Sequence, residues 1–224
     1  MLTDYQTLVI DLVRDDAAVV ITAERDRAIE LAVQRYSKDR ERLKVQDVVS
    51  TGVNTLPLPA AWETDFSDLK SLEYPVAQVP PEMLRPERYG FYTTPTAVTI
   101  QLLDAITVGA TVRATYSIVH VVSGAADTIP VADREPVACW AAAILCDELA
   151  AYYSGGTDST IQADSVRQQS KAQEYATRGA KLRRRYLDEL GIDDKRNVAA
   201  GVVVNLDGSD SLGQDRLTHP RRYR

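Results

Sequence analysis

One stretch of the chain has the residue types and the spacing of a phosphate-binding loop. It reads Ser154-Gly-Gly-Thr-Asp-Ser159 and fits the pattern SGGxDS. In such a loop the glycines let backbone amides close around a pyrophosphate group at the N-terminus of a helix. The chemistry would be the use of ATP to adenylate a substrate.

The residues around this stretch favour a plainer interpretation. The pattern resembles that of the ATP-pyrophosphatases, in which the loop leaves a buried parallel strand of an α/β domain. Here Asp147 and Glu148 come shortly before it, and a central strand would not bury two adjacent charges. We expect the glycines to end one helix and Asp158, Ser159 or Asp164 to cap the next. A nucleotide-using enzyme is kept as the alternative.

Histidines and cysteines offer little further chemistry. His120 and His219 are the only histidines and fall on different elements, so each is expected to be packed or hydrogen-bonded. Cys139 and Cys146 are seven residues apart on one predicted helix, or roughly 10 Å, which is too far for a disulfide. Without carboxylates at known positions these four residues cannot form a zinc site. We therefore predict no catalytic residues, no metal and no cofactor: the protein is not an enzyme.

Charged clusters are expected to have structural roles. Asp15-Asp16 and Asp193-Asp194 are expected to be solvated. Lys181 and Arg183–Arg185 make the end of the last long helix basic, which suits the helix dipole first and a partner or nucleic acid second. The net charge of −6 argues against a protein that mainly grips nucleic acid phosphate.

The composition is that of a globular protein. Of 224 residues, 45% are hydrophobic and 26% charged, which permits a real core. No run reaches the length of about 18 apolar residues that a membrane span needs. Met1 to Asp16 lacks the pattern of a secretory signal, so we expect a soluble protein that is intracellular when made.

Two helices between Asp133 and Leu190 organise the predicted fold. Val137 to Cys146 carries no charge, and a helix that is apolar all round must be covered on several sides. We expect Asp133 to cap it and Gly155-Gly156 to end it. The partner helix ends at Gly191. Its predicted buried stripe is Ala172, Tyr175, Ala176, Gly179, Arg183, Tyr186, Leu187 and Leu190.

Two further helices are predicted near the N-terminus. Thr3 and Gln6 match a capping box, and Thr22 is the expected cap of the second helix. The predicted faces are Tyr5, Leu8, Val9, Leu12 and Val13 in the first helix, and Ile29, Ala32, Val33 and Tyr36 in the second.

About five strands are predicted between these helix pairs. They are Leu43–Val49, the extended Thr55–Pro59, Tyr89–Thr93, Ala97–Leu103 and Thr111–Val122, the last including His120. Strands grouped between helices indicate an α+β fold. The predicted arrangement is a small bundle of about four helices with an inserted antiparallel β region and an extended C-terminal arm. Residues 1–42 and 123–191 form the helical core, residues 43–122 the β insertion and residues 192–224 the arm.

The arm changes in character along its length. Residues 193–215 are polar and acidic, with one apolar island at Val202–Val204. The last nine residues carry four arginines and no acid. Arginine and aromatic residues are favoured in anchored contacts. A merely loose end is the alternative. The candidate partner-binding residues are Arg216, Leu217, Pro220, Arg221, Arg222, Tyr223 and Arg224.

The order of these elements resembles a known family. Two helices lead into a β insertion bearing Leu69-Lys-Ser-Leu-Glu-Tyr-Pro-Val76 and ending in Thr111-Val-Arg-Ala-Thr-Tyr116. Then come Ile129-Pro-Val-Ala-Asp133, an alanine-rich helix and a long helix closing on Leu182-Arg-Arg-Arg-Tyr-Leu-Asp-Glu-Leu-Gly191. This is similar to the head-to-tail connector (adaptor) proteins of tailed bacteriophages.

The resemblance implies a structural virion protein at the junction of capsid and tail, assembled in the host cytoplasm. It implies a homo-oligomeric ring of about twelve copies beneath the portal protein, joined to a tail, stopper or tail-terminator protein. DNA would pass through the lumen without specific binding, and an acidic lining would repel its phosphates. The C-terminal arm would reach the portal, and no membrane is involved. A tail or baseplate component without portal contact is a third interpretation.

Overall fold

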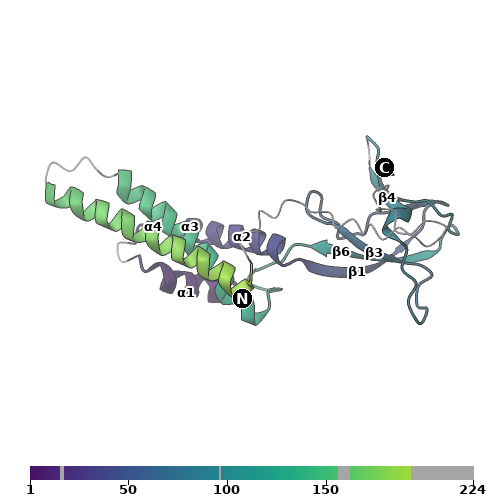
Figure 1. Cartoon of the computed structure of the whole chain (residues 1–224), viewed down its shortest axis with the longest axis horizontal. Coiled ribbons are helices and arrows are strands. Elements are labelled where there is room, and N and C mark those ends of the chain that lie inside the picture. Colours follow the sequence, from purple (N-terminus) through teal and green to yellow (C-terminus); the bar gives the residue numbers. More distant parts are fainter. Residues whose placement is uncertain (16–17, 96, 156–161, 193–224) are drawn as a thin grey trace, which may run out of the picture. The chain divides into compact units, whose positions relative to one another are not determined.

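The computed structural model describes residues 1–15, 18–95, 97–155 and 162–192. This part of the chain is α+β, with four α-helices and two small antiparallel sheets (Figure 1). The fold class expected from the sequence is therefore confirmed. Residues 1–192 form one compact unit.

The helices are α1 (Leu2–Val13), α2 (Thr22–Asp39), α3 (Arg134–Gly155) and α4 (Gln162–Leu190), with short 3-10 turns at Pro86–Arg88 and Val131–Asp133. The strands are β1 (Arg42–Val49), β2 (Thr55–Pro57), β3 (Leu69–Glu73), β4 (Tyr89–Thr93), β5 (Val98–Leu102) and β6 (Thr111–Ile118).

The N-cap residue of each N-terminal helix precedes the one expected from the sequence. The N-cap of α1 is Met1, so Thr3 lies inside the first turn. The N-cap of α2 is Ile21, whose backbone N–H donates to the Glu24 carboxylate at 3.1 Å. Thr22 is therefore the first helical residue and not the cap. The Glu24 carboxylate, at the third helical position, thus accepts a hydrogen bond from the N-cap amide, which is one half of a capping box.

The α3 helix is covered on several sides, as its lack of charge requires. It packs against α1, α2 and α4, and its buried residues include Ala141, Ala142 and Ala143. Small side chains let α4 approach closely, and Figure 1 shows the two helices side by side. Asp133, the expected cap, instead accepts a hydrogen bond from the Tyr36 hydroxyl.

The buried face of α4 follows the predicted stripe at Gly179, Tyr186 and Leu190 and differs from it at Ala176 and Leu182. Leu182, Tyr186 and Leu190 are buried, whereas Ala176 is exposed. A step of three residues from Gly179 reaches Leu182 and a step of four reaches Arg183. The predicted stripe included Arg183 and left out Leu182. Gly191 has φ +65°, a left-handed conformation that suits glycine and ends the helix as expected.

Each sheet has three strands, in the orders β1-β6-β3 and β2-β5-β4. All pairings are antiparallel, and β6 pairs with β1 along its full length, from Arg42 opposite Ile118 to Val49 opposite Thr111. The β3 strand was not predicted. The β6 strand ends at Ile118, so His120 follows the strand and does not belong to it.

Two hydrophobic clusters stabilise this part of the chain. The first joins all four helices and includes Tyr5, Ile29 and Leu145, with Ile192 packed against it. The second lies between the sheets and includes Leu56, Leu72 and Ile100. None of the helices in the described ranges has both the length and the apolar character needed to cross a membrane.

Candidate functional site

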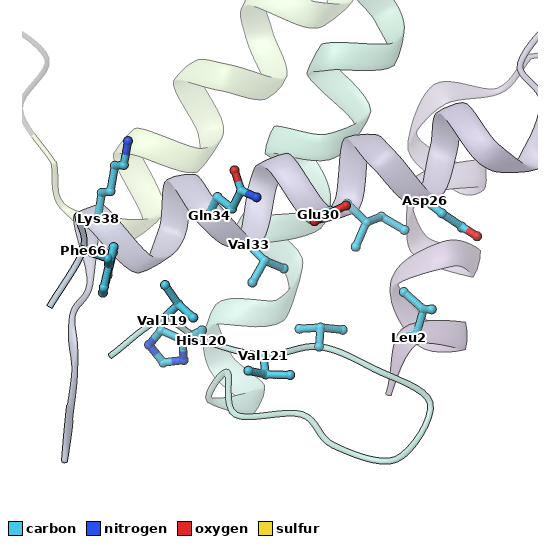
Figure 2. A pocket seen from close by; sticks show the side chains of 12 residues that line it. Leu2, Asp26, Glu30, Val33, Gln34, Lys38, Phe66, Val119, His120 and Val121 are labelled. Carbon is cyan, nitrogen blue, oxygen red and sulfur yellow. The ribbon is translucent and has the colours of Figure 1, made fainter. Parts of the chain in front are cut away.

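A groove runs along α2, between this helix and the segment that follows β6 (Figure 2). Its volume is about 560 Å³. The lining residues are Leu2, Asp26, Ile29, Glu30, Val33, Gln34, Lys38, Phe66, Val119, His120, Val121 and Val122. The groove thus combines residues that lie far apart in the sequence.

The floor of the groove is apolar. Ile29 and Val33 are buried on the inner face of α2, and Figure 2 shows Val33 above Val119 and Val121. Val121 is 43% exposed, so apolar surface is open to solvent here. A partner that covers this surface gains hydrophobic free energy.

One row of polar residues borders the groove on α2. Asp26, Glu30, Gln34 and Lys38 recur every four residues, a spacing that places them on one side of the helix. Asp26 accepts hydrogen bonds from Gln6 at 2.8 Å and Arg25 at 3.3 Å.

The two remaining charges of this row belong to Glu30 and Lys38. Arg27 pairs with Glu148 at 3.3 Å and Arg35 pairs with Asp39 at 2.7 Å, yet Glu30 and Lys38 form no ion pair with any residue the structure describes. The groove therefore offers opposite charges about 12 Å apart along the helix axis. Unpaired charges beside an apolar floor suit a polypeptide segment as the ligand.

His120 closes one end of the floor and is held by the backbone. Its Nε2 lies 3.1 Å from the Arg40 carbonyl oxygen, and its Nδ1 lies 3.1 Å from the Thr128 carbonyl oxygen and 3.2 Å from the Thr128 hydroxyl. The Tyr36 ring meets the imidazole edge-on at 4.9 Å. Burial lowers the pKa of His120, so the neutral ring is favoured. This histidine is packed and hydrogen-bonded, as expected.

The first two residues of the phosphate-loop motif lie at the end of a helix. Tyr152, Ser154 and Gly155 belong to α3, and Tyr152 is 61% exposed. A helix, α3, therefore leads into the motif here, whereas a buried parallel strand leads into the phosphate loop of the ATP-pyrophosphatases. Residues 156–161, including Asp158 and Ser159, lie outside the described residues.

The basic end of α4 is largely neutralised within the chain. Arg183 pairs with Asp147, and Arg185 pairs with Glu135 and, at 2.6 Å, with Glu189. Arg184, which is 84% exposed, lies 3.7 Å from Asp188. Most of these basic side chains are therefore paired with acidic residues of α3 or of α4 itself.

The two cysteines are core residues. Cys139 and Cys146 are free thiols with no exposed surface, and burial raises the pKa of each to about 11. Among the described residues, no three histidine, cysteine or carboxylate side chains come together in a way that could hold a metal ion.

The predicted partner-binding residues, Arg216 to Arg224, lie outside the described residues, as do His219 and Asp193-Asp194. Sequence reasoning did not identify the α2 groove. Its signal was the four-residue spacing of Asp26, Glu30, Gln34 and Lys38 beside the buried stripe, but the opposing wall comes from residues 119–122, which no local pattern on α2 could show.

Comparison with known proteins gives no further guide. A scan against protein families and a search of curated proteins find no match to this chain.

Proposed function

We propose that the protein is a structural virion component, a head-to-tail adaptor that forms a ring beneath the portal of a tailed bacteriophage. The observation that supports this most is the order of elements: two helices, an antiparallel β insertion, a long helical hairpin and then residues 193–224. This is the order on which the resemblance to the connector proteins rests. The proposed role is assembly, with no catalytic step.

Surface features agree with a role in assembly. The groove along α2 has an apolar floor and, at its border, Glu30 and Lys38, which form no ion pair within the described part of the chain. The β1 strand presents Leu43, Val45 and Val49 to solvent. Exposed apolar surface bordered by polar residues is typical of protein interaction sites.

The proposed partners follow from the adaptor role. Copies of the chain form the ring, the portal protein binds above it, and a tail, stopper or tail-terminator protein binds below. Residues Arg216 to Arg224 dock on the portal, since arginine and aromatic side chains anchor such contacts. DNA passes through the lumen, and an acidic lining keeps it from lodging there.

Electron microscopy of the purified full chain, alone and mixed with the portal protein of its virus, tests this proposal. We expect rings of about twelve copies that bind the portal. Removal of residues 216–224 should abolish portal binding and leave the rings intact. Rings that never bind the portal would favour a tail or baseplate component, and portal binding that survives this removal would show that residues 216–224 are not the docking segment.

The nucleotide-using alternative has its own assay. The chain is incubated with ATP and magnesium, and release of AMP and pyrophosphate is measured. Release that Asp158→Ala abolishes would overturn the structural role. We expect no release from either protein.

A further inference from the structure

The outer edge of β1 is open. This strand has eight residues and pairs through one edge with β6. Within the described ranges, no backbone group bonds to its other edge. An unpaired edge strand presents a row of N–H and C=O groups that can accept another strand.

The other sheet edges are closed or short. The β3 edge is covered by residues 82–84, because Leu84 N–H donates to the Leu72 carbonyl at 2.8 Å and Tyr74 N–H donates to the Glu82 carbonyl at 3.0 Å. The β2 strand has three residues and ends in Pro57, and β4 has five residues. The β1 edge is therefore the longest one available in the described sheets.

The side chains of β1 specify what could pair with it. Leu43, Val45 and Val49 lie on one face and are 56%, 57% and 54% exposed. Asp47 shares this face and pairs with Arg113 at 2.7 Å. Arg42 and Lys44 lie on the other face and make no ion pair with the described residues. A strand that alternates apolar residues with polar and acidic ones would complement both faces.

The chain itself contains such a sequence. Between Gly201 and Gly208 it reads Val202-Val-Val-Asn-Leu-Asp207. In an extended conformation Val202, Val204 and Leu206 share one face, and Asp207 falls on the other. The ten residues from Ile192 to Val202 can span up to about 33 Å, which gives this segment a wide reach.

We propose that Val202–Asp207 of one copy adds as an antiparallel strand to the β1 edge of a neighbouring copy. The register that fits best places Leu206 opposite Leu43, Val204 opposite Val45 and Asp207 opposite Arg42. Two apolar pairs then lie on one face, where Val202 falls opposite Asp47, which is paired with Arg113. On the other face the Asp207 carboxylate meets Arg42. Residues 216–224 remain available for the portal.

A ring explains why the donor is a neighbouring copy. Each copy of a closed ring needs two different surfaces that complement each other, so that contacts run head to tail. The β1 edge and the Val202–Asp207 segment form such a pair, since each complements the other better than it complements a second copy of itself. The inference rests on the proposed ring, because it requires neighbouring copies.

Disulfide trapping between two singly substituted full-length proteins tests the inference. Val45→Cys is prepared with an affinity tag and Val204→Cys without it, and the two are mixed and oxidised. We expect a covalent dimer that contains one chain of each kind, because opposed residues of an antiparallel pair bring their Cβ atoms to about 5 Å. The unsubstituted protein controls for the buried Cys139 and Cys146.

Val203→Cys is the matched control, because residue 203 would lie on the opposite face of the proposed strand. The mixed dimer should then be lost. A doubly substituted Val45→Cys/Val204→Cys chain that crosslinks only to itself would overturn the inference, as would dimers of Val45→Cys alone or no crosslink. The adaptor proposal fails separately: a crosslink without portal binding contradicts it, and rings without the crosslink contradict only the strand exchange.

Discussion

At the scale of single residues, His120 links the helical elements to the β insertion. Its backbone N–H donates to the Ser37 hydroxyl at 2.9 Å, and its ring lies between the Arg40 and Thr128 backbones. Both ring nitrogens face backbone carbonyl oxygens, and a neutral ring, which has one N–H, donates to only one of them, at Arg40 or at Thr128. Protonation would place a charge in a buried position.

This geometry predicts an acid-sensitive contribution to stability. Burial lowers the pKa of His120 in the folded protein, with nearby Arg42 also lowering it, while the unfolded chain keeps a value near 6.5. The unfolded state then takes up a proton first, so stability should be lost as the pH falls below about 6.5. His120→Gln should reduce this loss in denaturant titrations compared across the range from about pH 7.5 to pH 5.

The second histidine of the chain supplies the control. His219 lies outside the described residues. His219→Gln should leave the pH dependence of the unfolding free energy the same as in the unsubstituted protein. If His219→Gln flattened the pH dependence and His120→Gln did not, the assignment to His120 would be wrong.

Gly179 sets how closely α4 approaches α3. A Cβ atom at this position would lie 2.9 Å from Asp147 Oδ1 and 3.3 Å from both the Ala143 carbonyl oxygen and Cys146 Cβ. Overpacking at Gly179→Ala should cost about 1–3 kcal/mol, whereas the gain in helix propensity is at most about 1 kcal/mol. The free energy of unfolding should therefore fall. Chemical denaturation measures the difference.

Ala176→Leu tests the face assignment in the same helix. Ala176 is exposed, so the larger side chain should change the free energy of unfolding by no more than about 0.5 kcal/mol. A loss of several kcal/mol would mean that Ala176 lies on the packed face, as its position in the sequence stripe first indicated.

At the scale of elements, α3 is the helix that the others cover. Leu145 is 1% exposed and lies in the cluster that joins all four helices. Leu145→Ala should cost about 2–5 kcal/mol, because it removes buried carbon and leaves a cavity. Tyr152→Ala on the exposed side of the same helix should change stability by about 0.5 kcal/mol or less. Equal losses in thermal unfolding would contradict this burial pattern.

The success of prediction from sequence also varied by element. Long periodic segments were found, because the buried stripe of α2 and the alternation of Val112, Ala114 and Tyr116 in β6 follow one period throughout. The β3 strand was missed because a bulge between Leu69 and Ser71 breaks its alternation. The α2 groove and the open β1 edge could not be predicted, since both depend on which distant segments lie nearby.

At the scale of the whole molecule, residues 1–192 hold both hydrophobic clusters. Ile192, assigned to the arm by the sequence, packs against the helical cluster, and its N–H donates to the Leu187 carbonyl at 2.9 Å. A stable truncation should therefore keep Ile192 and remove only residues 193–224.

A chain that ends at Ile192 separates folding from assembly. Since it keeps both hydrophobic clusters, its unfolding free energy should lie within about 1 kcal/mol of that of the full chain at equal protein concentration below the assembly threshold. It lacks Val202–Asp207, so it should stay monomeric in light scattering where the full chain forms rings. A chain that ends at Asp215 keeps that segment and should still form rings, without portal binding. Rings from the shorter chain would show that the copies join through the surface of residues 1–192 alone.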